Sequence, residues 1–156
     1  MHYFVDGYNL LFRLSKDEKK SLQTKREILL ATLASFNLNL SIVFDSVLER
    51  HGIEERGHWQ NIEIIYTELG QSADAYIKQQ LMDSNTPRQE TVITSDRELA
   101  RICKHLGAHV QSIETFIEKI AKRKLKSRKP KLHPFKESDK EIARLLKIFE
   151  SRFHNP

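Results

Sequence analysis

The sequence has almost no cysteine and no long apolar run, and each shortage excludes a class of protein. Cys103 is the only cysteine among 156 residues, which excludes an internal disulfide framework and fits a reducing cytoplasm. The uncharged stretch 28–44 contains five Ser, Thr or Asn residues, and it is shorter than the ~20 apolar residues of a spanning helix. No signal peptide is visible, because Asp6 interrupts the first apolar stretch. We therefore expect a cytoplasmic protein without a membrane partner.

Several nucleotide and metal motifs are also missing. The sequence contains neither G-x-G-x-x-G nor G-x-x-x-x-G-K-[ST], so no nucleotide cofactor is expected. A D-x-D pattern for a phosphoryl-accepting aspartate is absent, since Gly7 and Tyr8 follow Asp6. The seven histidines show no metal-ligand spacing. These absences argue against phosphoryl relay and against zinc.

The composition is that of a soluble globular domain, but its charge is divided along the chain. Hydrophobic residues make up 39% and charged residues 30% of the sequence. Residues 1–118 hold 13 Lys/Arg and 17 Asp/Glu, a net charge of −4, whereas residues 119–156 hold 13 and 4, a net charge of +9. Such asymmetry indicates a polyanionic partner for the basic end.

Apolar periodicity predicts alternating strands and helices, which is typical of a layered α/β domain. The expected strands are 2–5, 40–44, 62–66, 91–94 and 108–110, and the expected helices lie within 17–36, 72–82, 95–107, 112–122 and from 138 onward. We expect a loop with at most one helical turn at 46–61. A basic linker is expected at 122–136.

Four of these strands end at an aspartate or lead to one. Asp6 and Asp45 follow the first two strands, Asp74 comes shortly after the third, and Asp96 follows the fourth. In a parallel sheet, the carboxyl ends of the strands meet at one edge, where α/β folds bind their ligands. Carboxylates gathered there resist ionisation unless a cation neutralises them. The pattern therefore predicts a divalent metal site.

Each acid also has a purely structural interpretation. Asp6-Gly7-Tyr8-Asn9 is a typical turn sequence, whereas in the functional interpretation Asp6 is a metal ligand and Gly7 lets the backbone bend sharply. Asp74 and Asp96 stand at expected helix starts, where carboxylates favour the helix dipole. Ser72 and Ser95 could cap those helices instead and leave both aspartates free for the site. Asp45 could be a ligand, an outer group that holds water, or simply the first polar residue after its strand.

Oxygen ligands of this kind favour Mg²⁺ or Mn²⁺. Such ions activate water for in-line attack on phosphorus and stabilise the leaving oxygen. A phosphodiester therefore suits both the acidic residues and the basic end of the chain. Asn9 would position an oxygen or a bound water.

The motifs resemble a known family. Residues 4–10, 43–45, 72–77 and 92–96 (FVDGYNL, VFD, SADAYI and VITSD) resemble the NYN branch of the PIN-like nucleases, and the YacP-like bacterial group most closely. The resemblance covers residues 2–122. Ser46 stands where that group often has glycine.

The resemblance implies a PIN-like three-layer domain, residues 1–122, with a parallel sheet of strand order 3-2-1-4-5 flanked by helices. Residues 123–156 would form the basic linker and C-terminal helix beside it. The implied activity is that of a metal-dependent endoribonuclease. The family's acidic site maps onto Asp6, Asp74 and Asp96, with Asn9 and Asp45 beside them. The implied substrate is single-stranded RNA or mRNA, with ribosome association left open.

Two surfaces are candidates for RNA binding, the expected loop at 46–61 and the basic run at 119–136. Trp59 in the expected loop could stack on an unpaired base, although packing over a core edge is the alternative. Basic side chains complete the candidates: Arg50, Arg56, Arg97, Lys122, Arg123, Lys124, Lys126, Arg128 and Lys129. Two other functions remain open, a structure-selective DNA nuclease and a non-catalytic RNA- or ribosome-binding adaptor.

Overall fold

The computed structural model describes residues 1–15, 18–46 and 55–128. Twelve elements lie in this part of the chain. They are β1 (His2–Asp6), α1 (Gly7–Leu14), α2 (Leu22–Ala34), β2 (Leu40–Phe44), β3 (Glu55–Trp59), β4 (Ile62–Tyr66), α3 (Ala73–Asp83), the 3₁₀ helix η2 (Pro87–Gln89), β5 (Glu90–Ile93), α4 (Arg97–His105), β6 (His109–Gln111) and α5 (Ile113–Arg128).

The described strands form one sheet in the order β3-β4-β2-β1-β5-β6. Five of them are parallel, and they have the relative order that the family resemblance implies. The sixth, β3, pairs antiparallel with β4 and forms one edge of the sheet. The prediction of a loop across 46–61 was therefore wrong for residues 55–59. Their pairing with β4, and not an apolar alternation of their own, makes them a strand.

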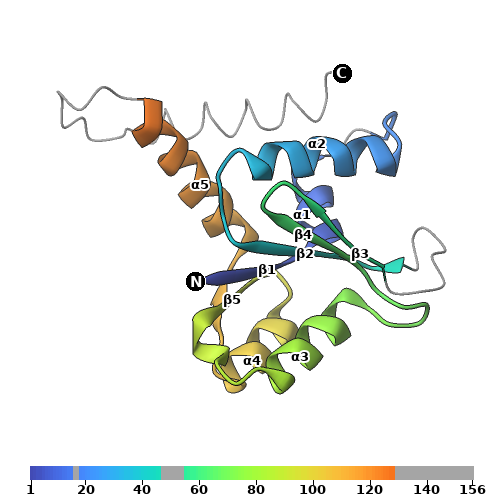
Figure 1. The fold of residues 1–156 in the computed structure, drawn as a ribbon, viewed down its shortest axis with the longest axis vertical. Helices are drawn as coiled ribbons and strands as arrows, with labels where there is room; N and C mark the ends of the chain where they lie inside the picture. The colour runs from blue at the N-terminus through green and yellow to red at the C-terminus, as the bar shows by residue number, and fades with distance from the viewer. Residues whose placement is uncertain (16–17, 47–54, 129–156) are drawn as a thin grey trace.

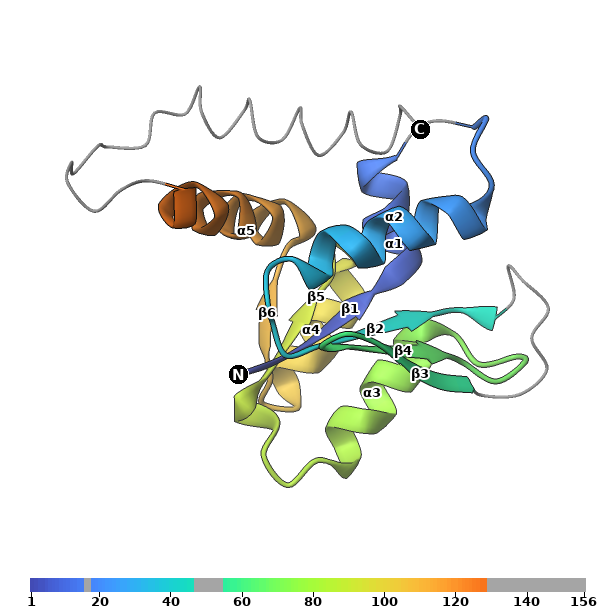
Figure 2. The same cartoon turned by 45° about the horizontal axis from the view of Figure 1, so that its top comes forward.

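Helices cover both faces of the sheet, as Figures 1 and 2 show. On one face, α1, α2 and α5 pack through residues such as Leu10, Leu29 and Phe116. On the other, α3 and α4 pack through residues such as Ile77 and Leu99. The sheet is therefore the middle layer of three, as the PIN-like prediction requires.

The central strand β2 is buried along its whole length, which its apolar sequence LSIVF allows. Alternate side chains serve opposite faces: Ile42 and Phe44 belong to the core under α1 and α2, and Val43 to the core over α3. Cys103 lies fully buried in that second core. Packing of the two cores on both faces holds the strands in position. It therefore also positions their carboxyl ends, which the aspartates follow.

Helix α1 was not predicted, because Asp6-Gly7-Tyr8-Asn9 was interpreted as a turn. Asp6 instead caps the helix, and Leu10, Leu11 and Leu14 are buried along it. Gly7 is needed for a close approach and not for a bend. A Cβ at Gly7 would lie 2.5 Å from Cε1 of Phe44, which is buried.

The basic linker predicted from residue 122 was also wrong at its beginning. Helix α5 continues through the basic residues to Arg128. The helix expected within 17–36 is present as α2, capped by Ser21. The remaining linker and the expected helix from 138 onward lie outside the described residues.

Candidate active site

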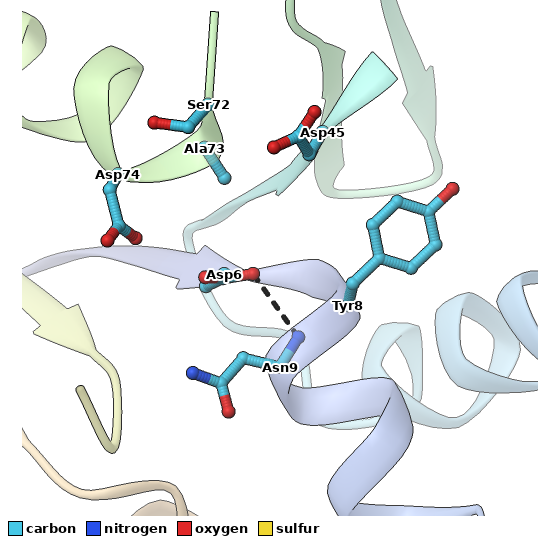
Figure 3. A pocket seen from close by; sticks show the side chains of 7 residues that line it. All are labelled: Asp6, Tyr8, Asn9, Asp45, Ser72, Ala73 and Asp74. Carbon is cyan, nitrogen blue, oxygen red and sulfur yellow. Dashed lines mark hydrogen bonds between the residues drawn. The ribbon is translucent and has the colours of Figure 1, made fainter. Parts of the chain in front are cut away.

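The carboxyl edge of the sheet contains a pocket of about 420 Å³ with three aspartates around it. Asp6 ends β1, Asp45 follows β2 directly, and Asp74 lies in the first turn of α3. Figure 3 shows Asp45 and Asp74 on opposite sides of this acidic pocket, with Asp6 between them. The full lining is Asp6, Tyr8, Asn9, Asp45, Ser72, Ala73 and Asp74. Three of the four predicted acids, and Asn9, are thus brought together.

Asp6 has the most perturbed carboxyl group of the pocket. Its Oδ1 accepts a hydrogen bond of 3.2 Å from the backbone N–H of Asn9, which caps α1. Burial nevertheless raises the pKa of Asp6 to about 6. The hydrogen bond from Asn9 opposes this rise, and the charges of Asp74, Asp45 and Asp96 add to it. Asp6 therefore stands where negative charge is already crowded.

Asp74 is free to serve the pocket because another residue caps α3. The hydroxyl of Ser72 accepts the N–H of Ala75 at 3.0 Å, as the sequence predicted. The pKa of Asp74 is raised, first by burial and then by the charge of Asp96, while Lys78 acts in the opposite direction. Asp74 thus belongs to the same group of repelling carboxylates as Asp6.

Asp45 is held in place by the residue that departs from the family pattern. The Ser46 N–H donates to Oγ1 of Thr67 at 3.2 Å, and the Ser46 hydroxyl donates to the Glu68 carbonyl at 2.9 Å. Ser46 is fully buried. These bonds anchor the end of β2 to the loop after β4 and fix the backbone that carries Asp45. Sequence reasoning missed this role, which has no signature in the sequence.

Asp96 differs from its prediction. Its Oδ1 accepts from the N–H groups of Glu98 and Leu99, so Asp96, and not Ser95, caps α4. Ser95 instead contacts the start of α5 through Ile113 and Glu114. Asp96 lines a second pocket beside the first, although its charge still raises the pKa values of Asp6 and Asp74.

The acidic pocket suits a hard divalent cation in its chemistry. The charged side chains that line it are all carboxylates. Burial, and after it the charges of neighbouring aspartates, raise the pKa values of Asp6 and Asp74, and a cation would offset both effects. Across residues 1–15, 18–46 and 55–128, however, no three His, Cys, Asp or Glu side chains stand close enough together to grip one ion. The donor types therefore fit Mg²⁺ or Mn²⁺, while the described side chains do not form a closed coordination shell.

Tyr8 also lines the pocket and was not predicted there. Its hydroxyl accepts a hydrogen bond of 3.2 Å from Nη1 of Arg26, a buried residue of α2. The Arg26 guanidinium lies 5.9 Å from the centre of the Phe44 ring and 5.6 Å from that of Tyr66. This buried cation–π cluster holds the Tyr8 side chain that lines the pocket. The pocket wall is thus a packed part of the core.

Three of the predicted RNA-binding residues in the described part of the chain, Trp59, Lys122 and Arg123, do not lie at the acidic pocket. Trp59 pairs with Ile62 at the beginning of β4, and thus lies at the amino ends of the parallel strands, opposite to the carboxyl ends that carry the acidic pocket. Lys119 of α5 lies over Tyr3 near the beginning of β1, so Lys122 and Arg123, further along α5, lie beyond those amino ends as well.

The remaining basic candidates are distributed as follows. Arg97 lines the second pocket. Arg56 belongs to β3, and Lys124, Lys126 and Arg128 belong to α5. Arg50 and Lys129 lie outside the described residues.

Comparison with known proteins identifies the family. The chain matches the YacP-like NYN domain over residues 3–151 and therefore belongs to that family. Membership places it among the PIN-like, nuclease-type domains with an RNA-related function. No helix of the described residues is both long and apolar enough to span a membrane.

Solved structures show the same fold. One is Rae1 (YacP) from Bacillus subtilis, with 23% identity, a TM-score of 0.62, and coverage of 82% of this chain and 79% of that one. A variant of that protein with a tryptophan-to-leucine change also has 23% identity, a TM-score of 0.57, and coverage of 99% and 97%. Among curated proteins, none matches significantly.

Proposed function

We propose that the protein is a metal-dependent endoribonuclease that hydrolyses RNA phosphodiester bonds at the acidic pocket. The observation that supports this most directly is the convergence of Asp6, Asp45 and Asp74 on one pocket, with the pKa of Asp6 raised to about 6. Three carboxylates grouped at the ends of the strands do not stabilise the fold. They are typical of a site that binds a cation together with a phosphate.

Asp6, Asp74 and Asp45 would draw closer together than they stand in the described structure to hold Mg²⁺ or Mn²⁺, and Asp96 would contribute its charge from the side. When bound, such an ion activates water and offsets the charge that develops on the phosphate oxygens. Asn9 stands beside Asp6 on the pocket wall, where its amide can orient water or a phosphate oxygen. Tyr8 limits the pocket on the other side, supported by Arg26.

The reaction is a hydrolysis. The oxygen of water forms a bond to the scissile phosphorus, and the bond from phosphorus to the 3′ oxygen breaks. The departing 3′ oxygen takes up a proton, which leaves a 3′-hydroxyl and a 5′-phosphate. We propose single-stranded RNA, mRNA in particular, as the substrate in the cytoplasm, since the family is RNA-related.

The test compares two changes on one helix. Asp74→Asn removes a pocket carboxylate at the start of α3, and Asp83→Asn removes an exposed carboxylate at its end. With labelled single-stranded RNA and Mn²⁺, we expect D74N to lower the cleavage rate by at least about 100-fold and D83N to leave it unchanged. Equal cutting by D74N and the wild type would refute the proposal. Parallel assays with flapped DNA separate the DNA nuclease alternative.

A non-catalytic RNA-binding adaptor is the second candidate. The observation that favours it is the lack of a closed group of three metal-binding side chains in the described part of the chain. Binding of RNA without turnover in Mg²⁺, Mn²⁺, Co²⁺ and Ca²⁺ would establish it. Cleavage that requires Asp74 would exclude it.

A further inference from the structure

A second pocket, of about 440 Å³, opens beside the acidic one. Four segments meet around it: α1, the turn between β5 and α4, α4 itself, and the turn from β6 into α5. It differs from the first pocket in its charge. Arg13, Arg97 and Lys104 provide three cations, against two acids, Asp96 and Glu114.

The structure already contains an anion held in this second pocket. The carboxylate of Glu114 is paired with Nη2 of Arg13 through Oε1, and its Oε2 accepts from the Ser95 hydroxyl at 3.2 Å. A backbone phosphate offers the same kind of acceptor oxygens with more charge. The groups that hold Glu114 therefore form a set of donors suited to phosphate. All three cations are exposed, so an arriving strand can reach them.

The two pockets are aligned along α1. Asn9 lines the acidic pocket and Arg13 lines the second, and four residues along a helix place them on one face, ~6 Å apart. Asp96 stands at the boundary, since it lines the second pocket while its charge acts on Asp6 and Asp74. A nucleic-acid strand advances by ~3.4 Å per nucleotide in a helix and by more when extended. If the pockets are spaced as Asn9 and Arg13 are along the helix, one or two nucleotides bridge them.

We propose that the second pocket binds a backbone phosphate of the RNA one or two nucleotides away from the phosphate cleaved at the acidic pocket, through Arg13, Arg97 and Lys104. This inference rests on the proposed function, because the acidic pocket defines the cleaved bond. Contacts to phosphate fix the position of a strand without reading its sequence. The second pocket thus sets the register of the strand at the carboxylates.

The experiment measures RNA binding separately from cleavage. The probe is a fluorescein-labelled single-stranded oligoribonucleotide, and its anisotropy is followed in EDTA over a range of salt concentrations. The variants are Arg13→Gln, Arg97→Gln and Lys104→Gln, singly and combined. Arg88→Gln is the matched control, because Arg88 precedes β5 at the opposite edge of the sheet and lines another pocket. Thermal melting confirms that each variant folds.

We expect each single change to raise the dissociation constant about three- to tenfold and to reduce the slope of log K against log salt by about 0.7. The triple variant loses about 2 units of slope, whereas R88Q matches the wild type. The loss is the same for oligoribonucleotides of different sequence, as a phosphate contact requires.

The outcomes separate this inference from the function on which it rests. If the wild type cleaves RNA and the pocket variants bind with unchanged affinity and slope, the phosphate pocket is refuted and the nuclease remains. If binding depends on the pocket while the wild type never cleaves, the phosphate pocket stands and the nuclease fails. If the wild type does not bind RNA in EDTA, the phosphate pocket is refuted, and the cleavage assay with Mn²⁺ decides the nuclease separately.

Discussion

Replacing Asp6 with asparagine tests the electrostatics of the acidic pocket without any substrate. Burial and neighbouring carboxylates raise the pKa of Asp6 from 3.8 to about 6 in the folded protein. The folded state therefore favours protonated Asp6. The resulting stability is fully present below pH 3.8 and is lost as the pH rises through about 6. Asparagine cannot ionise, and it caps helices about as well as aspartate. The bond to Asn9 is thereby retained.

The expected size follows from the rise of the pKa of Asp6 from 3.8 to about 6. At 1.36 kcal/mol per unit, ionised Asp6 costs the metal-free protein about 3 kcal/mol at pH 7.5 and less than about 1 kcal/mol at pH 4. We therefore expect Asp6→Asn to unfold ~6–12 °C above the wild type at pH 7.5 in EDTA, and close to it at pH 4. If the acidic pocket binds Mn²⁺ as proposed, we expect Mn²⁺ at one hundred times its dissociation constant to stabilise the wild type by about 2.7 kcal/mol and to leave the variant unchanged.

The assay is thermal unfolding followed by circular dichroism at both pH values, with and without Mn²⁺. Asp83→Asn serves as the control for loss of one negative charge at an exposed site. If Asp6→Asn melts at or below the wild-type temperature at pH 7.5 in EDTA, burial and the neighbouring carboxylates do not disfavour ionised Asp6 as described. A difference that stays constant down to pH 4 would contradict the assigned pKa.

Two further predictions concern the support of the pocket. Gly7→Ala places a Cβ against the buried Phe44 ring, and we expect a net destabilisation of about 1–2 kcal/mol despite the better helix propensity of alanine; a urea midpoint at or above the wild-type value would show that the ring can move. Ser46→Ala leaves the Glu68 carbonyl without its hydroxyl donor, and we expect a loss of about 1–2 kcal/mol together with a lower rate of RNA cleavage. In that second case an unchanged urea midpoint and rate would remove Ser46 from the support of Asp45.

Much of the acidic pocket could be predicted because strand ends are visible in the sequence. Short apolar runs stop at Asp6 and Asp45, and the parallel order brings those ends together. The cap of α4 could not be predicted in this way. Ser95 and Asp96 are both good capping residues, and the choice depends on which side chain the backbone turns toward the free N–H groups. In the fold, contacts with α5 occupy Ser95 and leave the cap to Asp96.

The segments that were missed share a dependence on neighbours far along the chain. Strand β3 has the sequence ERGHW, which lacks an apolar alternation and becomes a strand only through its pairing with β4. Helix α1 was hidden by a sequence that is equally suited to a turn, and its buried leucines fold against a core supplied by α2 and β2. Lys119 of α5 lies over Tyr3, so the basic residues of this helix lie away from the acidic pocket. The distribution of charge along the sequence does not reveal this position.

The pairing of Arg13 with Glu114 has a consequence for how selective this surface can be. A bare cluster of cations attracts any polyanion, but here one of the three is already engaged by a carboxylate of the same chain. If a strand binds there as proposed, its phosphate would have to exchange partners with Glu114, which favours a strand that presents its phosphate close to Arg13. Heparin or duplex DNA held at a distance would gain little from Arg13. Because the Arg13 and Glu114 side chains are 58% and 49% exposed, the pair is worth at most about 1 kcal/mol, and the preference it gives to a well-placed phosphate would be correspondingly small.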